Sequence, residues 1–181
     1  MRGFRRYFGF FKRKEEFLEK IKNGAVFIYP TDTIYGIGCL ASNKKSVEKI
    51  RQLKKRNRKP FSVIVPSKKW IEENYKCNAQ VKKVLKKLPG KYTIIVELKN
   101  KSKSPNKNLN TLGVRIPKHW ISKVVVEIKE PIITTSVNIS NEPHMTSLKD
   151  INKQIKSKVD FIINVGLLNK LPSKIINTIS K

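Results

Sequence analysis

The first group of side chains suited to catalysis or ligand binding lies in the segment 29–38. Two hydroxyls and a carboxylate, from Thr31, Asp32 and Thr33, precede two glycines that let the backbone turn tightly or approach a ligand. The apolar run 25–28 before them predicts a buried strand, which a proline then ends. Because open α/β sheets bind ligands at strand ends, the segment predicts a site. A helix-capping turn made by Asp32 and Thr33 is the alternative interpretation.

A second group of candidates is a basic cluster further along the chain. Nine of the residues 44–59 are basic and only Glu48 is acidic. Cations packed this closely repel one another unless an anion or solvent screens them. The cluster therefore indicates a phosphate site, or alternatively a solvated helix end that the helix dipole favours. Its densest part lies just before Pro60 and consists of Lys54, Lys55, Arg56, Arg58 and Lys59.

Three further candidates lie in or after apolar runs. Arg115 stands inside the short predicted strand 112–116, and an isolated buried charge is costly, so Arg115 should either pair with an acid or face a ligand anion. Ser136 and Asn138 follow the predicted strand 132–135, as the polar residues of segment 29–38 follow theirs. They either belong to a site or simply terminate the strand.

The elements that must position these residues alternate along the chain, which predicts an α/β fold with an open sheet. Apolar spacing predicts helices at 14–23, 43–53, 81–88, 119–128 and around 148–155, with a short one after Ser67. Apolar runs predict strands at 25–28, 61–65, 92–98, 112–116, 132–135, 161–164 and 175–179. The polar segment 99–110 should be a surface loop.

Length and composition limit the class of protein. The 181 residues predict a single domain over residues 15–181, preceded by a basic, aromatic arm at 1–14. Forty basic residues against 13 acids give a formal charge of +27, which favours anionic partners such as nucleotides or RNA, although a general bias towards lysine would also produce it. The two cysteines suggest neither zinc nor a disulfide. No apolar run approaches the roughly 20 residues needed to span a bilayer, so we expect a soluble protein, and the cysteine usage fits a reducing cytoplasm.

Four separated motifs, in this order and spacing, resemble the YrdC-like threonylcarbamoyl-AMP synthases of tRNA modification. The resemblance extends from about residue 14 to the end of the chain. It implies an open, twisted, mixed β-sheet flanked by helices, in the short, single-domain form of the family. The motifs are residues 30–38, Lys54-Lys55-Arg56 with Lys59-Pro60, residues 113–117, and residues 135–140.

The resemblance implies an enzyme, a nucleotidyltransferase that joins L-threonine, bicarbonate and ATP into threonylcarbamoyl-AMP with release of pyrophosphate. Mg²⁺ is expected with ATP, without identified protein ligands, and the threonylcarbamoyl-transferase machinery that acts on tRNA is the expected partner. Since no residue stands out as a covalent nucleophile, Lys54 and Arg56 should act by positioning and charge. The residues that match ATP-binding positions are Arg56, Lys59, Thr111, Ser136 and Asn138, and those that match threonine-binding positions are Thr33, Arg115, Thr134 and Ser173.

The sequence departs from the family pattern at several positions. Only Asn57 and Arg58 separate Arg56 from Lys59, where the family has three residues, so Arg58 is an alternative phosphate ligand. The other departures are Val137, Asn141, Lys174 and Asn177.

Two other functions compete with the synthase. One is RNA binding through the same basic surface, for which the aromatic residues show no stacking pattern. The other is carbamoyl transfer, as in the YrdC-like domain of hydrogenase-maturation proteins.

Overall fold

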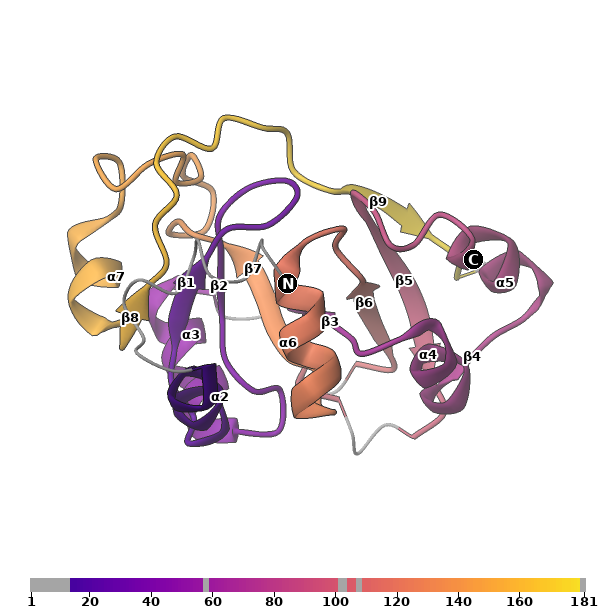
Figure 1. Cartoon of the computed structure of the whole chain (residues 1–181). Coiled ribbons are helices and arrows are strands. Elements are labelled where there is room, and N and C mark those ends of the chain that lie inside the picture. Colours follow the sequence, from indigo (N-terminus) through magenta and orange to yellow (C-terminus); the bar gives the residue numbers. More distant parts are fainter. Residues whose placement is uncertain (1–13, 57–58, 101–103, 107–108, 180–181) are drawn as a thin grey trace.

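The computed structural model describes residues 14–56, 59–100, 104–106 and 109–179 (Figure 1). The helices are α2 Lys14–Lys22, α3 Lys44–Leu53, α4 Lys68–Asn74, α5 Ala79–Leu85, α6 Trp120–Ile128 and α7 Lys153–Lys158. The strands are β1 Phe27–Tyr29, β2 Gly36–Gly38, β3 Ser62–Ile64, β4 Tyr75–Lys76, β5 Tyr92–Leu98, β6 Thr111–Arg115, β7 Ile132–Ser136, β8 Phe161–Ile162 and β9 Lys174–Asn177. The predicted arm lies outside the described residues except for Lys14, which begins α2.

Within the described residues the strands form one mixed, open sheet in the order β4-β5-β6-β3-β7-β2-β1-β8, with β9 added beside β5. Strand β1 runs antiparallel to β2, which runs antiparallel to β7. Parallel pairs also occur, such as β3 with β6 and β5 with β9. The predicted fold class, a mixed open sheet flanked by helices, is confirmed.

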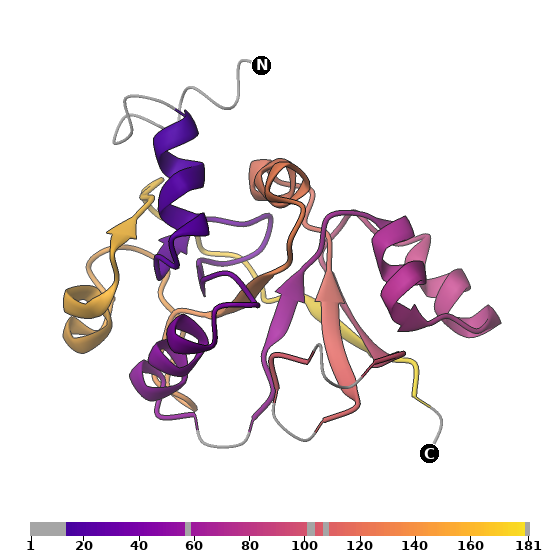
Figure 2. The same cartoon turned by 90° about the horizontal axis from the view of Figure 1, so that it is seen from below.

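Two hydrophobic clusters lie on opposite faces of this sheet. Helices α2 and α6 contribute Phe17, Trp120 and Val124 to one cluster, where the Phe17 ring meets the Phe161 ring edge-on at 5.6 Å. Helices α3, α4, α5 and α7 contribute to the other cluster. Figure 2 shows α2 and α6 on one side of the sheet and α3 on the other. The helices packed on both faces of the sheet therefore fix the positions of its strands, and with them the strand ends that form the candidate site.

Side-chain caps explain where several helices begin. The Asn43 side chain accepts a hydrogen bond from the Ser46 N–H at the start of α3, and Ser67 caps α4 in the same way. The helix predicted around 148–155 is shorter than expected. The Asp150 carboxylate accepts hydrogen bonds from the N–H groups of Thr146 and Ser147, so a side-chain-bonded turn occupies the first part of that segment.

Strands β2 and β4 were not predicted. Strand β2 consists of Gly36, Ile37 and Gly38, and glycine is rare in strands because it weakens them. A Cβ atom added at Gly38 would lie 2.2 Å from the carbonyl oxygen of Ile133. The glycine therefore permits β2 to approach β7 closely. No helix in the described part of the chain is long and apolar enough to cross a membrane.

Candidate active site

A cavity of about 250 Å³ lies on the face of the sheet that α6 covers in part. Hydroxyl groups and two guanidinium groups dominate its polar lining, so it is suited to anionic or strongly polar ligands. Five residues predicted from the sequence line this cavity together: Arg56, Arg115, Thr134, Ser136 and Ser173.

The loop 30–35 joins β1 to the antiparallel strand β2 and forms one wall of the cavity. Because a strand follows the loop, the helix-capping interpretation is wrong. Thr31 lines the cavity, whereas Thr33 is fully buried beneath it. The two hydroxyls hydrogen-bond each other at 2.9 Å, and the Thr31 hydroxyl also donates to the carbonyl oxygen of Ile34. Contact between Thr33 and substrate stays a prediction, since its hydroxyl is engaged with Thr31.

Arg115 pairs with an acid, which is the first of the two outcomes considered for it, and it also lines the cavity, so contact with a ligand anion stays a prediction. Its Nη2 lies 3.0 Å from Oδ1 of Asp32 and 3.2 Å from the Thr33 hydroxyl. The other carboxylate oxygen of Asp32 accepts a hydrogen bond from the Lys118 N–H at 2.9 Å. Burial lowers the pKa of Arg115, while Asp32 opposes that shift. Nε of Arg115 is buried and has no hydrogen-bond partner among the described residues, so one donor remains for a ligand.

The turn after α3 holds Arg56 rigidly at the cavity wall. Nε of Arg56 donates to the carbonyl oxygen of Lys59 at 2.9 Å, Nη2 donates to that of Pro60, and Nη1 donates to the Thr135 hydroxyl at 2.9 Å. The guanidinium also lies 4.9 Å from the centre of the Phe61 ring. Burial, and then the charge of Arg51, lower the pKa of Arg56. The arrangement presents a preorganised cation whose remaining donors are available to an anion.

Lys54 lies beneath the segment that carries Ser136 and Asn138. Its side chain is 1% exposed, and its ammonium donates to the carbonyl oxygens of Ser136 and Asn138 at 2.5 and 2.7 Å and to Asn138 Oδ1 at 2.9 Å. The Ser136 hydroxyl also donates to Asn138 Oδ1, at 2.6 Å. Burial and the charge of Arg56 lower the pKa of Lys54 to about 7. Lys54 therefore holds the backbone of residues 136–138 in position.

Besides Thr33, three predicted ligands do not line the cavity. The Lys59 ammonium donates to Asn141 Oδ1 at 2.7 Å, and Asn138 is bound to Lys54. Thr111 begins β6, four positions before Arg115, which places it about 13 Å away along the strand. Their roles in binding ATP stay predictions. Arg58, the alternative phosphate ligand, lies outside the described residues.

Several cavity residues were missed by the sequence analysis because they lie within strands rather than after them. They include Ser62 and Thr93, which line the cavity, and the Thr93 hydroxyl shares a hydrogen bond of 2.7 Å with that of Ser173. The available signal was a single small hydroxyl residue next to the apolar run of a predicted strand, as at Ser62 and Thr93.

The segment 163–173 between β8 and β9 runs over the loop 30–35 (Figure 1). The Tyr35 hydroxyl fastens it, because it donates to the carbonyl oxygen of Gly166 at 2.8 Å and accepts from the Val165 N–H at 2.9 Å. This crossing brings Ser173 to the cavity, so residues from both ends of the chain meet there.

Metal ligands are scarce around the cavity. The described residues contain no group of three or more His, Cys, Asp or Glu side chains that could hold a metal ion. Asp32 already binds Arg115 and the Lys118 N–H through its two oxygens. A divalent cation here would therefore have to be bound mainly by oxygens of its ligand.

Comparison with known proteins identifies relatives along nearly the whole chain. Residues 19–181 match the family model Sua5_yciO_yrdC, which is described as telomere recombination. A protein of Methanocaldococcus jannaschii named putative threonylcarbamoyl-AMP synthase is 40% identical over 159 residues, which cover 86% of this chain and 75% of that protein. A threonylcarbamoyl-AMP synthase of Buchnera aphidicola is 32% identical over 169 residues, covering 88% of this chain and 95% of that protein.

A similar solved structure is that of P. abyssi Sua5 complexed with L-threonine. It superposes with a TM-score of 0.77 at 26% identity and covers 90% of this chain. The match covers 49% of the Sua5 chain, so the present chain spans about half the length of that protein.

Proposed function

Because the chain belongs to the Sua5/YciO/YrdC family, we propose that it is a threonylcarbamoyl-AMP synthase that joins L-threonine, bicarbonate and ATP and releases pyrophosphate. The observation that carries this proposal is the meeting of Arg56 and Arg115 in one hydroxyl-lined cavity. One guanidinium can bind a phosphate group of ATP, and the other can bind the carboxylate of L-threonine. The names of the relatives support the same activity.

The reaction needs three groups to be brought together. The threonine amine adds to bicarbonate with loss of water to form a carbamate. A carbamate oxygen then attacks the α-phosphorus of ATP, the bond from that phosphorus to the bridging oxygen breaks, and pyrophosphate leaves. Holding the reactants in this geometry is itself a large part of catalysis, and fixed cations stabilise charge that develops on the phosphates.

Arg56 is the residue we assign to the phosphates. Three of its donors are already fixed on Lys59, Pro60 and Thr135, so it needs no reorganisation when the triphosphate binds. Lys54 holds the backbone that carries Ser136, and we assign Ser136 and Asn138 to the nucleotide. Mg²⁺ would arrive with ATP and neutralise part of the phosphate charge.

Arg115 is the residue we assign to the threonine carboxylate. Its buried, unpartnered Nε supports this role, because a buried donor without a partner is costly until a ligand accepts from it. Asp32 fixes the guanidinium, and Thr31 lines the cavity beside it while its hydroxyl stabilises the loop. Thr134 and Ser173 are further polar contacts for this substrate.

The product is a mixed anhydride, and we propose that it serves the threonylcarbamoyl modification of tRNA through a separate transferase. RNA binding as the sole function is not favoured, because the inner cations of the basic cluster are bound to the protein itself. Lys54 and Arg56 both donate mainly to backbone carbonyls. A diffuse RNA-binding surface needs no such fixed geometry.

The decisive experiment is a pyrophosphate-release assay with ATP, Mg²⁺, bicarbonate and each amino acid in turn. We expect release that requires both threonine and bicarbonate, with serine as the closest amino-acid control. Release that does not depend on threonine, or no release although ATP binds, would contradict the synthase proposal.

A further inference from the structure

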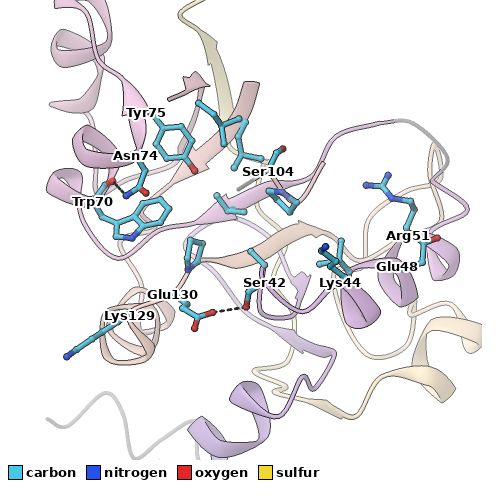
Figure 3. A pocket seen from close by; sticks show the side chains of 17 residues that line it. Ser42, Lys44, Glu48, Arg51, Trp70, Asn74, Tyr75, Ser104, Lys129 and Glu130 are labelled. Atoms are coloured by element: carbon cyan, nitrogen blue, oxygen red, sulfur yellow. Dashed lines mark hydrogen bonds between the residues drawn. The ribbon is translucent and has the colours of Figure 1, made fainter. Parts of the chain in front are cut away.

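A second and larger cavity, of about 820 Å³, lies on the opposite face of the sheet from the candidate active site (Figure 3). Val63 lines it, whereas the neighbouring Ser62 lines the first cavity, and successive residues of a strand point to opposite faces. The two cavities share no lining residue among those described. A volume of this size falls in the range of small-molecule sites, which is about 300–1,000 Å³.

The inner wall of this second cavity is apolar and partly aromatic. Val47, Leu98 and Leu112 line it and are nearly inaccessible to solvent. The rings of Trp70 and Tyr75 stand side by side with centroids 5.8 Å apart. Such a wall favours a flat, apolar ring system, which can stack or pack edge-on against the two aromatic side chains.

Tyr75 supplies a polar group without a protein partner. The residue is 2% exposed, and its hydroxyl makes no hydrogen bond with any described residue, while Figure 3 shows that hydroxyl directed into the cavity. Burial raises the pKa of Tyr75, so the hydroxyl stays protonated and can donate. The hydroxyl is not fully buried, because it opens onto the cavity, so an acceptor on a ligand could hydrogen-bond it there.

Arg51 supplies an anion-binding group at the far end of the cavity. Its Nη1 donates to the carbonyl oxygens of Arg56 and Lys59 at 3.0 and 3.3 Å, and its Nε and Nη2 make no hydrogen bond with a described residue. The free edge of a fixed guanidinium suits a carboxylate or phosphate. The charged residues that line the cavity are Lys44, Glu48, Arg51, Lys129 and Glu130, and Glu130 already accepts a hydrogen bond of 2.7 Å from Ser42.

We propose that this second cavity binds a small molecule that combines an aromatic ring system with one anionic group. The ring lies against Trp70 and Tyr75, an acceptor on the ligand meets the Tyr75 hydroxyl, and the anion meets Arg51. The second site uses neither Arg56 nor Arg115 as a ligand, although Arg51 also donates to the backbone of the turn that carries Arg56.

The experiment uses two fluorescent probes with the same ring and opposite charge, dansylglycine and dansylcadaverine. Emission of each probe is titrated with the full chain in the presence of saturating pyrophosphate, which has no ring system and occupies the phosphate site of the candidate active site. We expect dansylglycine to bind at one site per chain and at least tenfold more tightly than dansylcadaverine. Tyr75→Phe should weaken dansylglycine binding about fivefold, through loss of one hydrogen bond, and Arg51→Gln should weaken it about tenfold.

Two matched variants control for unrelated effects. Tyr92→Phe removes a hydroxyl and Lys69→Gln removes a positive charge, and neither residue lines the second cavity. Circular dichroism of each variant establishes that it is folded. Any of three results would overturn the proposal: no binding of dansylglycine, equal binding of both probes, or equal affinity in the two test variants and their controls.

Discussion

Arg115 and Asp32 form an ion pair of 3.0 Å whose two side chains are only 7% and 8% exposed. The pair joins the end of β6 to the loop 30–35, and it fixes the guanidinium at the wall of the candidate active site. Because removing one partner of a buried pair leaves an uncompensated charge, the pair has a measurable role in stability as well as in binding.

Asp32→Asn should therefore destabilise the fold. The variant keeps the size of the side chain but leaves Arg115 charged and without its counter-ion, at a cost of about 3 kcal/mol in the free energy of unfolding. Chemical denaturation measures this value. The control is Glu97→Gln, which breaks an exposed pair with Lys76 and should cost less than about 1 kcal/mol. Similar losses in both variants would contradict a special role for the buried pair.

Arg56→Ala should reduce turnover at least tenfold, which corresponds to about 1.4 kcal/mol of transition-state stabilisation. The physical reason is the loss of a cation held in place before the triphosphate binds. Pyrophosphate release at saturating substrates measures the effect. Lys69→Ala is the control, because its side chain is 86% exposed on α4 and lines neither cavity. Equal losses in the two variants would indicate that only the general positive charge matters.

Much of the fold follows from sequence patterns with a direct physical cause. The apolar run 92–98 is the strand β5 over the same residues, and Ser67 begins α4 as its capping preference predicts. The site was also predictable where polar residues lie at the end of a strand, as at Ser136. These features are local, so a single stretch of sequence specifies them.

The unpredicted features depend on contacts between distant segments. Arg115 was expected to meet an acid or an anion, but its partner Asp32 is 83 positions away, and only the folded sheet brings the two together. Lys54 was expected beside the phosphates, whereas the fold turns its ammonium inward to the Ser136–Asn138 segment. Strand β2 is too rich in glycine to be found by β propensity.

Thr31 and Thr33 offer a matched pair within one loop. Thr31→Val should raise the KM for threonine several-fold, because Thr31 lines the cavity, and should also lower the free energy of unfolding by about 1 kcal/mol, because its buried hydroxyl donates to the carbonyl oxygen of Ile34. Thr33→Val should lower the free energy of unfolding by a similar amount but leave the KM nearly unchanged, because Thr33 does not line the cavity and its buried hydroxyl links Thr31 to Arg115. Steady-state kinetics and denaturation separate the two effects. A large change in KM at Thr33 without loss of stability would show direct contact with substrate.

Lys54 should make stability depend on pH. Burial and Arg56 lower its pKa in the folded protein to about 7, whereas an unfolded lysine titrates near 10.4. Between these values the unfolded chain binds more protons than the folded one, so the free energy of unfolding should rise with pH, by about 1 kcal/mol from pH 7 to pH 8. Denaturation at several pH values, compared with Lys54→Met, isolates this contribution because the variant cannot titrate at residue 54. The same pH slope in both proteins would assign the effect to other groups. Nitrogen-15 NMR of the Lys54 ammonium then measures its pKa directly, and a value near 10 would rule out the predicted dependence.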